Sequence, residues 1–195
     1  MTCNNPHITD IEEVVRLGVK RFPSIKHGIT YSGRSFENGV PDAKDVLYIG
    51  AFVTEKPQQI AGLMQFWTNK FMDHITIAYR PPQEVIDLLF KGVNDIPIKM
   101  IDAGITKEDT ILIGKEMKAN VFRVIHDNMA CVALVTIDHP CQNAYPHITI
   151  GTAETVKPFY SNDLIQRHFN NDVDKEIFQS SMTFDVDVRI GVMLK

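Results

Sequence analysis

The tetrapeptide His-Ile-Thr-Ile occurs twice in this chain, at residues 74–77 and again at residues 147–150. Histidine suits proton transfer near neutral pH, because its unperturbed pKa is about 6.5. Two histidines on opposite sides of a phosphorus atom can act as general base and general acid, and threonine hydroxyls can donate hydrogen bonds to the non-bridging oxygens. The two copies therefore fit an in-line displacement at a phosphodiester, and this scheme requires no metal ion.

Both copies lie in stretches that have the character of β-strands, at residues 74–79 and residues 146–152. Successive side chains of a strand point to opposite faces, so the histidine and threonine of each copy share one face and its two isoleucines share the other. We predict a core position for Ile75, Ile77, Ile148 and Ile150, and a common polar surface for His74, Thr76, His147 and Thr149.

The three-residue pattern His-x-Thr is a weak signal by itself, since His7, Ile8 and Thr9 also fit it. That third match precedes a predicted amphipathic helix over residues 11–22, where Thr9 and Glu12 fit a capping box, so a structural role is favoured. A single histidine on a strand is more often a surface or core residue than a catalytic one. Two matched four-residue copies on strands favour chemistry.

Two H-x-T-x motifs on strands at this spacing resemble the 2H phosphoesterase superfamily. The second block, YPHITIGTAETVKPFYSNDLI at residues 145–165, is similar to the end-healing cyclic phosphodiesterase domain of plant and fungal tRNA ligases. In that domain a Pro-His-hydrophobic-Thr run is followed by a segment ending in a small residue, Asn and Leu. The order and spacing of the motifs extend the resemblance to about residues 46–170, and the chain has no GxxxxGK[ST] phosphate loop.

The resemblance implies an α+β, two-lobed 2H phosphoesterase fold, with antiparallel sheets facing a central cleft and helices outside. Residues 1–195 would form a single bilobal domain, in which residues 1–45 are a helix and loop of unassigned role. It also implies catalysis by His74, Thr76, His147 and Thr149 without cofactor or metal, with His147 as base and His74 as acid. The expected substrate is a ribose 2′,3′-cyclic phosphate, on an RNA end or a nucleotide, opened to a 2′-phosphate as in tRNA splicing and RNA repair.

Two alternatives keep the same fold. In one, the four residues cut 2′,5′-oligoadenylate or a cyclic oligonucleotide signal, as viral or phage relatives that counteract host defence do. In the other, the chain is a catalytically silent module that binds a nucleotide or RNA. Intact histidines and threonines in both motifs favour the enzyme over the binding module.

Aromatic side chains near the motifs are candidates for stacking on a base, which is an interaction that does not depend on the nucleotide sequence. Each of them can equally be a packing residue. Tyr145 precedes His147 by two positions and so shares its face if the strand extends that far. The predicted substrate-binding residues are Tyr145, Tyr79 and Trp67.

Hydrophobic periodicity and turn residues outline the rest of the chain. The repeated short strands with Lys, Gly and Asn turns indicate antiparallel meanders. We predict a loop at residues 26–45, further strands at residues 46–54, 97–105, 109–115, 119–127, 130–137 and 183–194, and helices at residues 57–66, 83–90, 162–169 and 174–179.

The formal net charge of −4 argues against a long non-specific nucleic-acid footprint, but allows a small nucleotide or an RNA terminus. The chain has three cysteines and no CxxC pair, which predicts a reducing, intracellular location, the cytoplasm. No secretory signal or apolar stretch of membrane-spanning length is seen, so we expect no membrane association. The oligomeric state stays open.

Overall fold

The computed structural model describes residues 7–8, 29–31, 34–36, 41–91, 114–139, 141–170 and 177–195. The helix predicted over residues 11–22 and the strand predicted over residues 97–105 lie outside these residues, as does most of the strand predicted over residues 109–115. Within the predicted loop at residues 26–45, two short strands, β2 (Ile29–Tyr31) and β3 (Arg34–Phe36), pair antiparallel with each other. The loop prediction is wrong there because mutual pairing satisfies the backbone groups of both segments.

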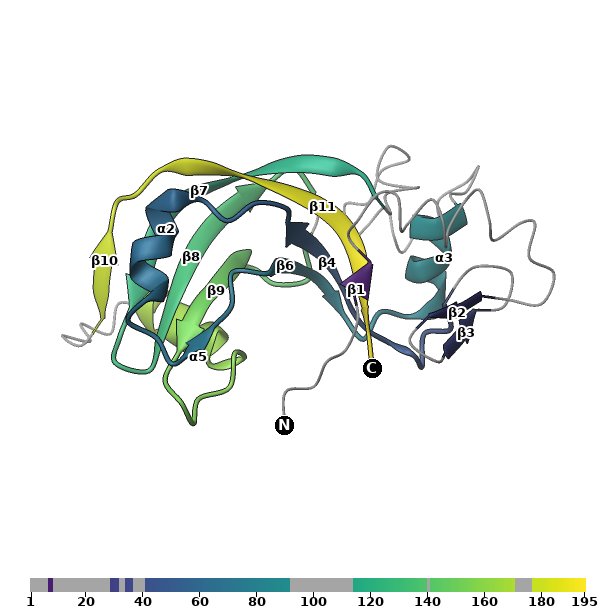
Figure 1. The fold of residues 1–195 in the computed structure, drawn as a ribbon, viewed down its shortest axis with the longest axis horizontal. Coiled ribbons are helices and arrows are strands. Elements are labelled where there is room, and N and C mark those ends of the chain that lie inside the picture. The colour runs from purple at the N-terminus through teal and green to yellow at the C-terminus, as the bar shows by residue number, and fades with distance from the viewer. Residues whose placement is uncertain are drawn as a thin grey trace.

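The other described strands form a nine-stranded antiparallel sheet that curls round and closes on itself (Figure 1). The strands of the closed ring run in the order β11, β4, β6, β9, β8, β7 and back to β11. Three short strands extend it: β1 pairs with β11, β10 pairs with β7, and β5 pairs with β9. The bounds are β1 His7–Ile8, β4 Val46–Val53, β5 Asn69–Lys70, β6 His74–Tyr79, β7 Glu116–His126, β8 Ala130–Ile137, β9 His147–Thr152, β10 Phe178–Ser180 and β11 Phe184–Leu194.

Two junctions hold the ring together. The long strand β11 pairs with β7 over residues 184–189 and with β4 over residues 188–194. On the other side of the ring, β6 meets β9 at the pair Ile75 and Ile148. The antiparallel α+β architecture is therefore confirmed, whereas the sheets expected on two sides of a cleft are joined here into one ring.

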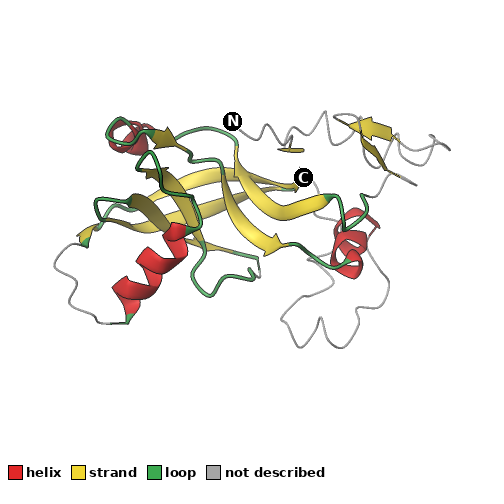
Figure 2. Ribbon diagram, turned by 90° about the horizontal axis from the view of Figure 1, so that it is seen from below, coloured by secondary structure: helices red, strands yellow, loops and turns green. Residues whose placement is uncertain are grey.

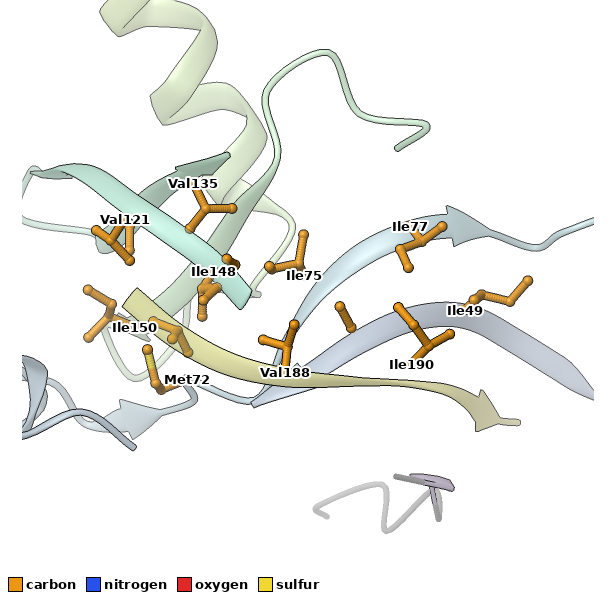
Figure 3. Close-up of a cluster of buried hydrophobic side chains, with 14 of the residues drawn as sticks. Ile49, Met72, Ile75, Ile77, Val121, Val135, Ile148, Ile150, Val188 and Ile190 are labelled. Atoms are coloured by element: carbon orange, nitrogen blue, oxygen red, sulfur yellow. The ribbon is translucent and has the colours of Figure 1, made fainter. Parts of the chain in front are cut away.

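The interior of the ring is filled by the apolar side chains that alternate along its strands (Figure 3). Ile75 and Ile148 are fully buried, as are Val188 and Ile190 of β11. Alternation on each strand sends one face inward and the other outward. The predicted core positions of Ile75, Ile77, Ile148 and Ile150 are confirmed.

The described helices lie around the strands (Figure 2). They are α2 (Gln58–Met64), α3 (Gln83–Lys91) and α5 (Tyr160–Phe169), which confirms three of the predicted helices. Helix α2 adds Ile60 and Met64 to the core inside the ring. Helix α5 packs Leu164 and Ile165 on a second apolar cluster at the outer face of β7 and β8. Among the described residues, none of the helices is long and apolar enough to cross a bilayer.

The helix predicted at residues 174–179 is wrong at its C-terminal end, where β10 begins. Phe178 pairs with His126 of β7, and Gln179 pairs with Ile125. Pairing with an existing sheet edge supplies more backbone hydrogen bonds than an isolated helical turn, so this tertiary contact decides the local structure.

Candidate active site

The four polar residues of the two motifs lie on the outer face of two neighbouring strands, β6 and β9. Ile75 pairs with Ile148 and both point inward, so the residues next to them in each strand point outward. If this antiparallel register is continued, His74 stands opposite Thr149 and lies on the diagonal from His147. Diagonal neighbours in a regular sheet are about 7–8 Å apart, which leaves room for a phosphate between the two rings.

His147 has a fixed hydrogen-bond partner on one ring nitrogen. Its Nδ1 lies 2.9 Å from the backbone carbonyl oxygen of Tyr145. A carbonyl only accepts hydrogen bonds, so Nδ1 carries the proton and Nε2 of the neutral ring is an acceptor. Burial lowers the pKa of His147, partly opposed by the bond to the Tyr145 carbonyl. The neutral ring is thus prepared to take up a proton at Nε2.

His74 has a different partner, the phenol of Tyr48 on strand β4. The two rings stack with centroids 4.4 Å apart and an interplanar angle of 20°, and Phe52 flanks the imidazole at 5.7 Å. The Tyr48 hydroxyl lies 3.3 Å from Nδ1 of His74. A phenol can donate to Nδ1 or accept from it, so Nε2 of His74 can carry a hydrogen in both protonation states of the ring.

Tyr48 stays protonated at neutral pH. Burial raises the pKa of its hydroxyl, and the negative charge of Asp73 raises it further. Sequence reasoning missed this residue because Tyr48 lies in an apolar stretch that a buried strand explains. The ring of Tyr48 reaches His74 across Gly50, which has no side chain, and this contact depends on the pairing of β4 with β6.

The threonines of the two motifs also differ in their hydrogen-bond partners. The hydroxyl of Thr149 lies 2.8 Å from the hydroxyl of Ser161, which is fully buried in the first turn of α5. Thr76 pairs across the strands with Gly50 and is half-buried, and within the described part of the chain its hydroxyl has no hydrogen-bond partner. One hydroxyl is therefore held by the protein, and the other is available to a ligand.

Tyr145 directly precedes the row of polar residues on β9, whereas Trp67 packs against the core inside the ring. Tyr145 is 46% exposed, and its ring stacks on Phe169 with centroids 4.2 Å apart. Trp67 packs over Gly151, because a Cβ built on Gly151 would lie 2.5 Å from the Cβ of Trp67. A bulge at Ile150 interrupts the alternation of β9, so Gly151 pairs with the core residue Cys131 and faces inward. Trp67 therefore lies on the side of β9 opposite to His147 and Thr149.

Tyr79, the third aromatic candidate, lies at the end of β6 that is distant from His74. A bulge at Ile77 interrupts the alternation of β6, so Ala78 packs against the core and Tyr79 shares the outer face with its pairing partner Tyr48. Tyr79 is 50% exposed, and the guanidinium of Arg80 lies 5.3 Å from its ring centroid.

Residues 69–192 match the family model of the fungal tRNA ligase phosphodiesterase domain. The chain belongs to this family. The match covers β6 and β9 with both motifs, so the resemblance drawn from the sequence is confirmed. No curated protein matches the chain.

Among solved structures, a crystal structure of a fungal RNA kinase is similar, with 11% sequence identity and a TM-score of 0.48. The alignment covers 95% of this chain and 57% of that structure's chain, so this protein spans little more than half the length of that relative.

Proposed function

We propose that the protein is a metal-independent phosphodiesterase that opens a ribose 2′,3′-cyclic phosphate, on an RNA end or a nucleotide, to a 2′-phosphate. The observation that carries this proposal is the pair of histidines on adjacent strands with unlike partners at Nδ1. His147 faces a carbonyl oxygen, and His74 faces a phenol. The motifs are nearly symmetric in sequence, but these partners give the two rings different proton chemistry.

In the proposed reaction, Nε2 of His147 takes a proton from water as the water oxygen bonds to phosphorus. The bond from phosphorus to the 3′ oxygen breaks in line, and Nε2 of protonated His74 gives its proton to that oxygen. The hydroxyls of Thr76 and Thr149 donate hydrogen bonds to the non-bridging oxygens, where charge grows. The product is a 2′-phosphate beside a free 3′ hydroxyl, and proton exchange with solvent restores both histidines.

A cytoplasmic, reducing location is part of the proposal. Cys131 and Cys141 are both free thiols. Burial raises the pKa of Cys131 to about 12 and that of Cys141 to about 11, so neither thiol ionises readily at neutral pH.

A panel of substrates analysed by ³¹P NMR tests the proposed substrate and the site of cleavage. We expect adenosine 2′,3′-cyclic phosphate and a short RNA with a cyclic phosphate end to yield a 2′-phosphate. Turnover of 2′,5′-oligoadenylate or a cyclic oligonucleotide in place of these compounds would show that the same residues degrade a nucleotide signal. Tight binding of nucleotides with no turnover of any compound would show a binding module.

A further inference from the structure

A pocket of about 310 Å³ opens between the loop that precedes β9 and helix α5. Its lining differs from that of a phosphate site, because no charged side chain of the described residues contributes to it. The loop supplies Asn143 and Tyr145, and α5 with its C-terminal end supplies Asn162, Ile165, Gln166 and Asn170. We call this the amide pocket, after its four carboxamides.

The chemistry of the lining matches a neutral planar ligand with donors and acceptors along its edge. Each carboxamide presents an acceptor oxygen and two donor hydrogens. Asn and Gln side chains pair in this way with N6 and N7 of adenine. Ile165 is almost fully buried and gives the pocket an apolar wall.

The polar groups of the amide pocket are largely uncommitted. Within the described part of the chain, the side-chain amides of Asn143, Gln166 and Asn170 make no hydrogen bond. The amide nitrogen of Asn162 donates to the Phe159 carbonyl at 3.2 Å, which leaves its oxygen as an acceptor. One face of Tyr145 lies on Phe169, and the tyrosine is still 46% exposed.

The amide pocket is tied to the catalytic strand at two points. The carbonyl of Tyr145 accepts the hydrogen bond from His147, so the pocket begins at the residue that fixes the proposed base. Asn162 follows Ser161, whose hydroxyl holds Thr149. A base and a 2′,3′-cyclic phosphate are separated by one ribose, so the base must lie in a site adjacent to the phosphate.

We propose that the amide pocket holds the nucleobase of the substrate nucleotide, with adenine as the favoured base. This inference rests on the proposed function, since it assumes that the phosphate lies between His74 and His147. The amides would bind the hydrogen-bonding edge of the base, and Tyr145 would contact its ring. The enzyme would then favour a nucleoside 2′,3′-cyclic phosphate over a ribose cyclic phosphate that lacks the base.

The test compares adenosine 2′,3′-cyclic phosphate with ribose 2′,3′-cyclic phosphate, which lacks the base. We expect wild type to have the higher kcat/KM on the nucleotide. Gln166→Met keeps the length of the side chain and removes the amide, so it lowers this value by about 2–10-fold for one lost hydrogen bond. The base-free substrate is unaffected by Gln166→Met. The matched control, Gln59→Met at an exposed position of α2, changes kcat/KM on neither substrate.

Equal use of both substrates by wild type, or an equal loss on both in Gln166→Met, would overturn the inference. If wild type opens neither substrate, the proposed function fails, and calorimetric titration with adenosine 2′,3′-cyclic phosphate decides on the amide pocket alone. Weaker binding by Gln166→Met than by wild type and Gln59→Met supports the pocket. Equal binding by all three proteins, or no binding by wild type, overturns it.

Discussion

The contact between Thr149 and Ser161 allows a double-mutant test of how the site is held. The two hydroxyl oxygens are 2.8 Å apart, and Ser161 is fully buried. If Thr149 donates to a phosphate oxygen, Ser161 orients that hydroxyl by donating to it. Ser161→Ala then removes one neutral hydrogen bond, worth about 0.5–1.5 kcal/mol, and lowers kcat by about 2–10-fold.

Thr149→Val keeps a β-branched side chain of the same shape and removes the donor to a charged oxygen. That loss is worth about 1.5–3 kcal/mol, or about 10–150-fold in kcat. In the Thr149→Val background, Ser161→Ala should change kcat by less than about twofold, because the group through which Ser161 acts is gone. The assay is steady-state opening of adenosine 2′,3′-cyclic phosphate by the four proteins of the cycle.

Stability gives the cycle a second readout with a defined sign. Thr149→Val leaves the buried Ser161 hydroxyl without its partner, which costs about 1–3 kcal/mol. Adding Ser161→Ala removes that unpaired group, so the double variant should melt no lower than Thr149→Val alone. If the two losses in kcat multiply instead, Ser161 acts by a route other than Thr149, and the reasoning is refuted.

Three further predictions follow from single contacts. Tyr48→Phe keeps the ring on His74 and removes a long hydrogen bond of 3.3 Å, so kcat on the natural substrate should fall by about 2–10-fold. A substrate whose leaving 3′ oxygen is replaced by sulfur should show no such loss, because a thiolate leaves without an acid. An equal loss on both substrates contradicts this role. Burial lowers the pKa of His147, so the acidic limb of kcat/KM, where activity is lost as the base gains a proton, should have its midpoint below about pH 6.5, and a midpoint at or above that value counts against His147 as the base. Gly151→Ala brings a Cβ to 2.5 Å from Trp67 and should lower the free energy of unfolding by about 1–3 kcal/mol, measured by thermal melting. The control Gly62→Ala, whose Cβ meets nothing within 4 Å in helix α2, should raise the free energy of unfolding by about 0.5–1 kcal/mol. Equal melting temperatures for the two variants would contradict the packing of Trp67.

The strands of both motifs were predictable from the sequence because a half-buried strand has a period of two residues. Residues 74–77 and 147–150 follow that period, so alternation alone assigns the isoleucines to the inward face and the histidines to the outward face. Bulges at Ile77 and Ile150 end the alternation, and the sequence does not predict them. Helix α5 follows the helical period instead, because Ser161, Leu164 and Ile165, at positions i, i+3 and i+4, form its buried face.

Closure of the ring was not predictable, because it depends on which strands meet. One strand, β11, pairs with two different partners along its length, and periodicity does not encode this choice. The short strand β10 gains its conformation from β7, although its sequence predicts the end of a helix. Local pattern predicts an element, whereas pairing between distant segments decides register and partner.

The residues that orient the catalytic groups were missed for a related reason. Tyr48 fits a buried strand and Ser161 fits the start of a helix, so neither called for a further explanation in the sequence. Their roles arise from registers that bring them to His74 and Thr149. Ser161 did lie in the YSNDL segment that carried the family resemblance, which was the one signal available.

The most direct test of the central claim is opening of adenosine 2′,3′-cyclic phosphate in EDTA by wild type, His74→Ala and His147→Ala. Gln59→Met, at an exposed position of α2, serves as the matched surface control. We predict that wild type and Gln59→Met yield adenosine 2′-phosphate, and that each histidine variant loses about 10²–10⁴-fold in rate, as expected for loss of a general acid or base. Undiminished turnover by either histidine variant, or turnover by wild type that EDTA abolishes, would contradict acid–base catalysis by this pair.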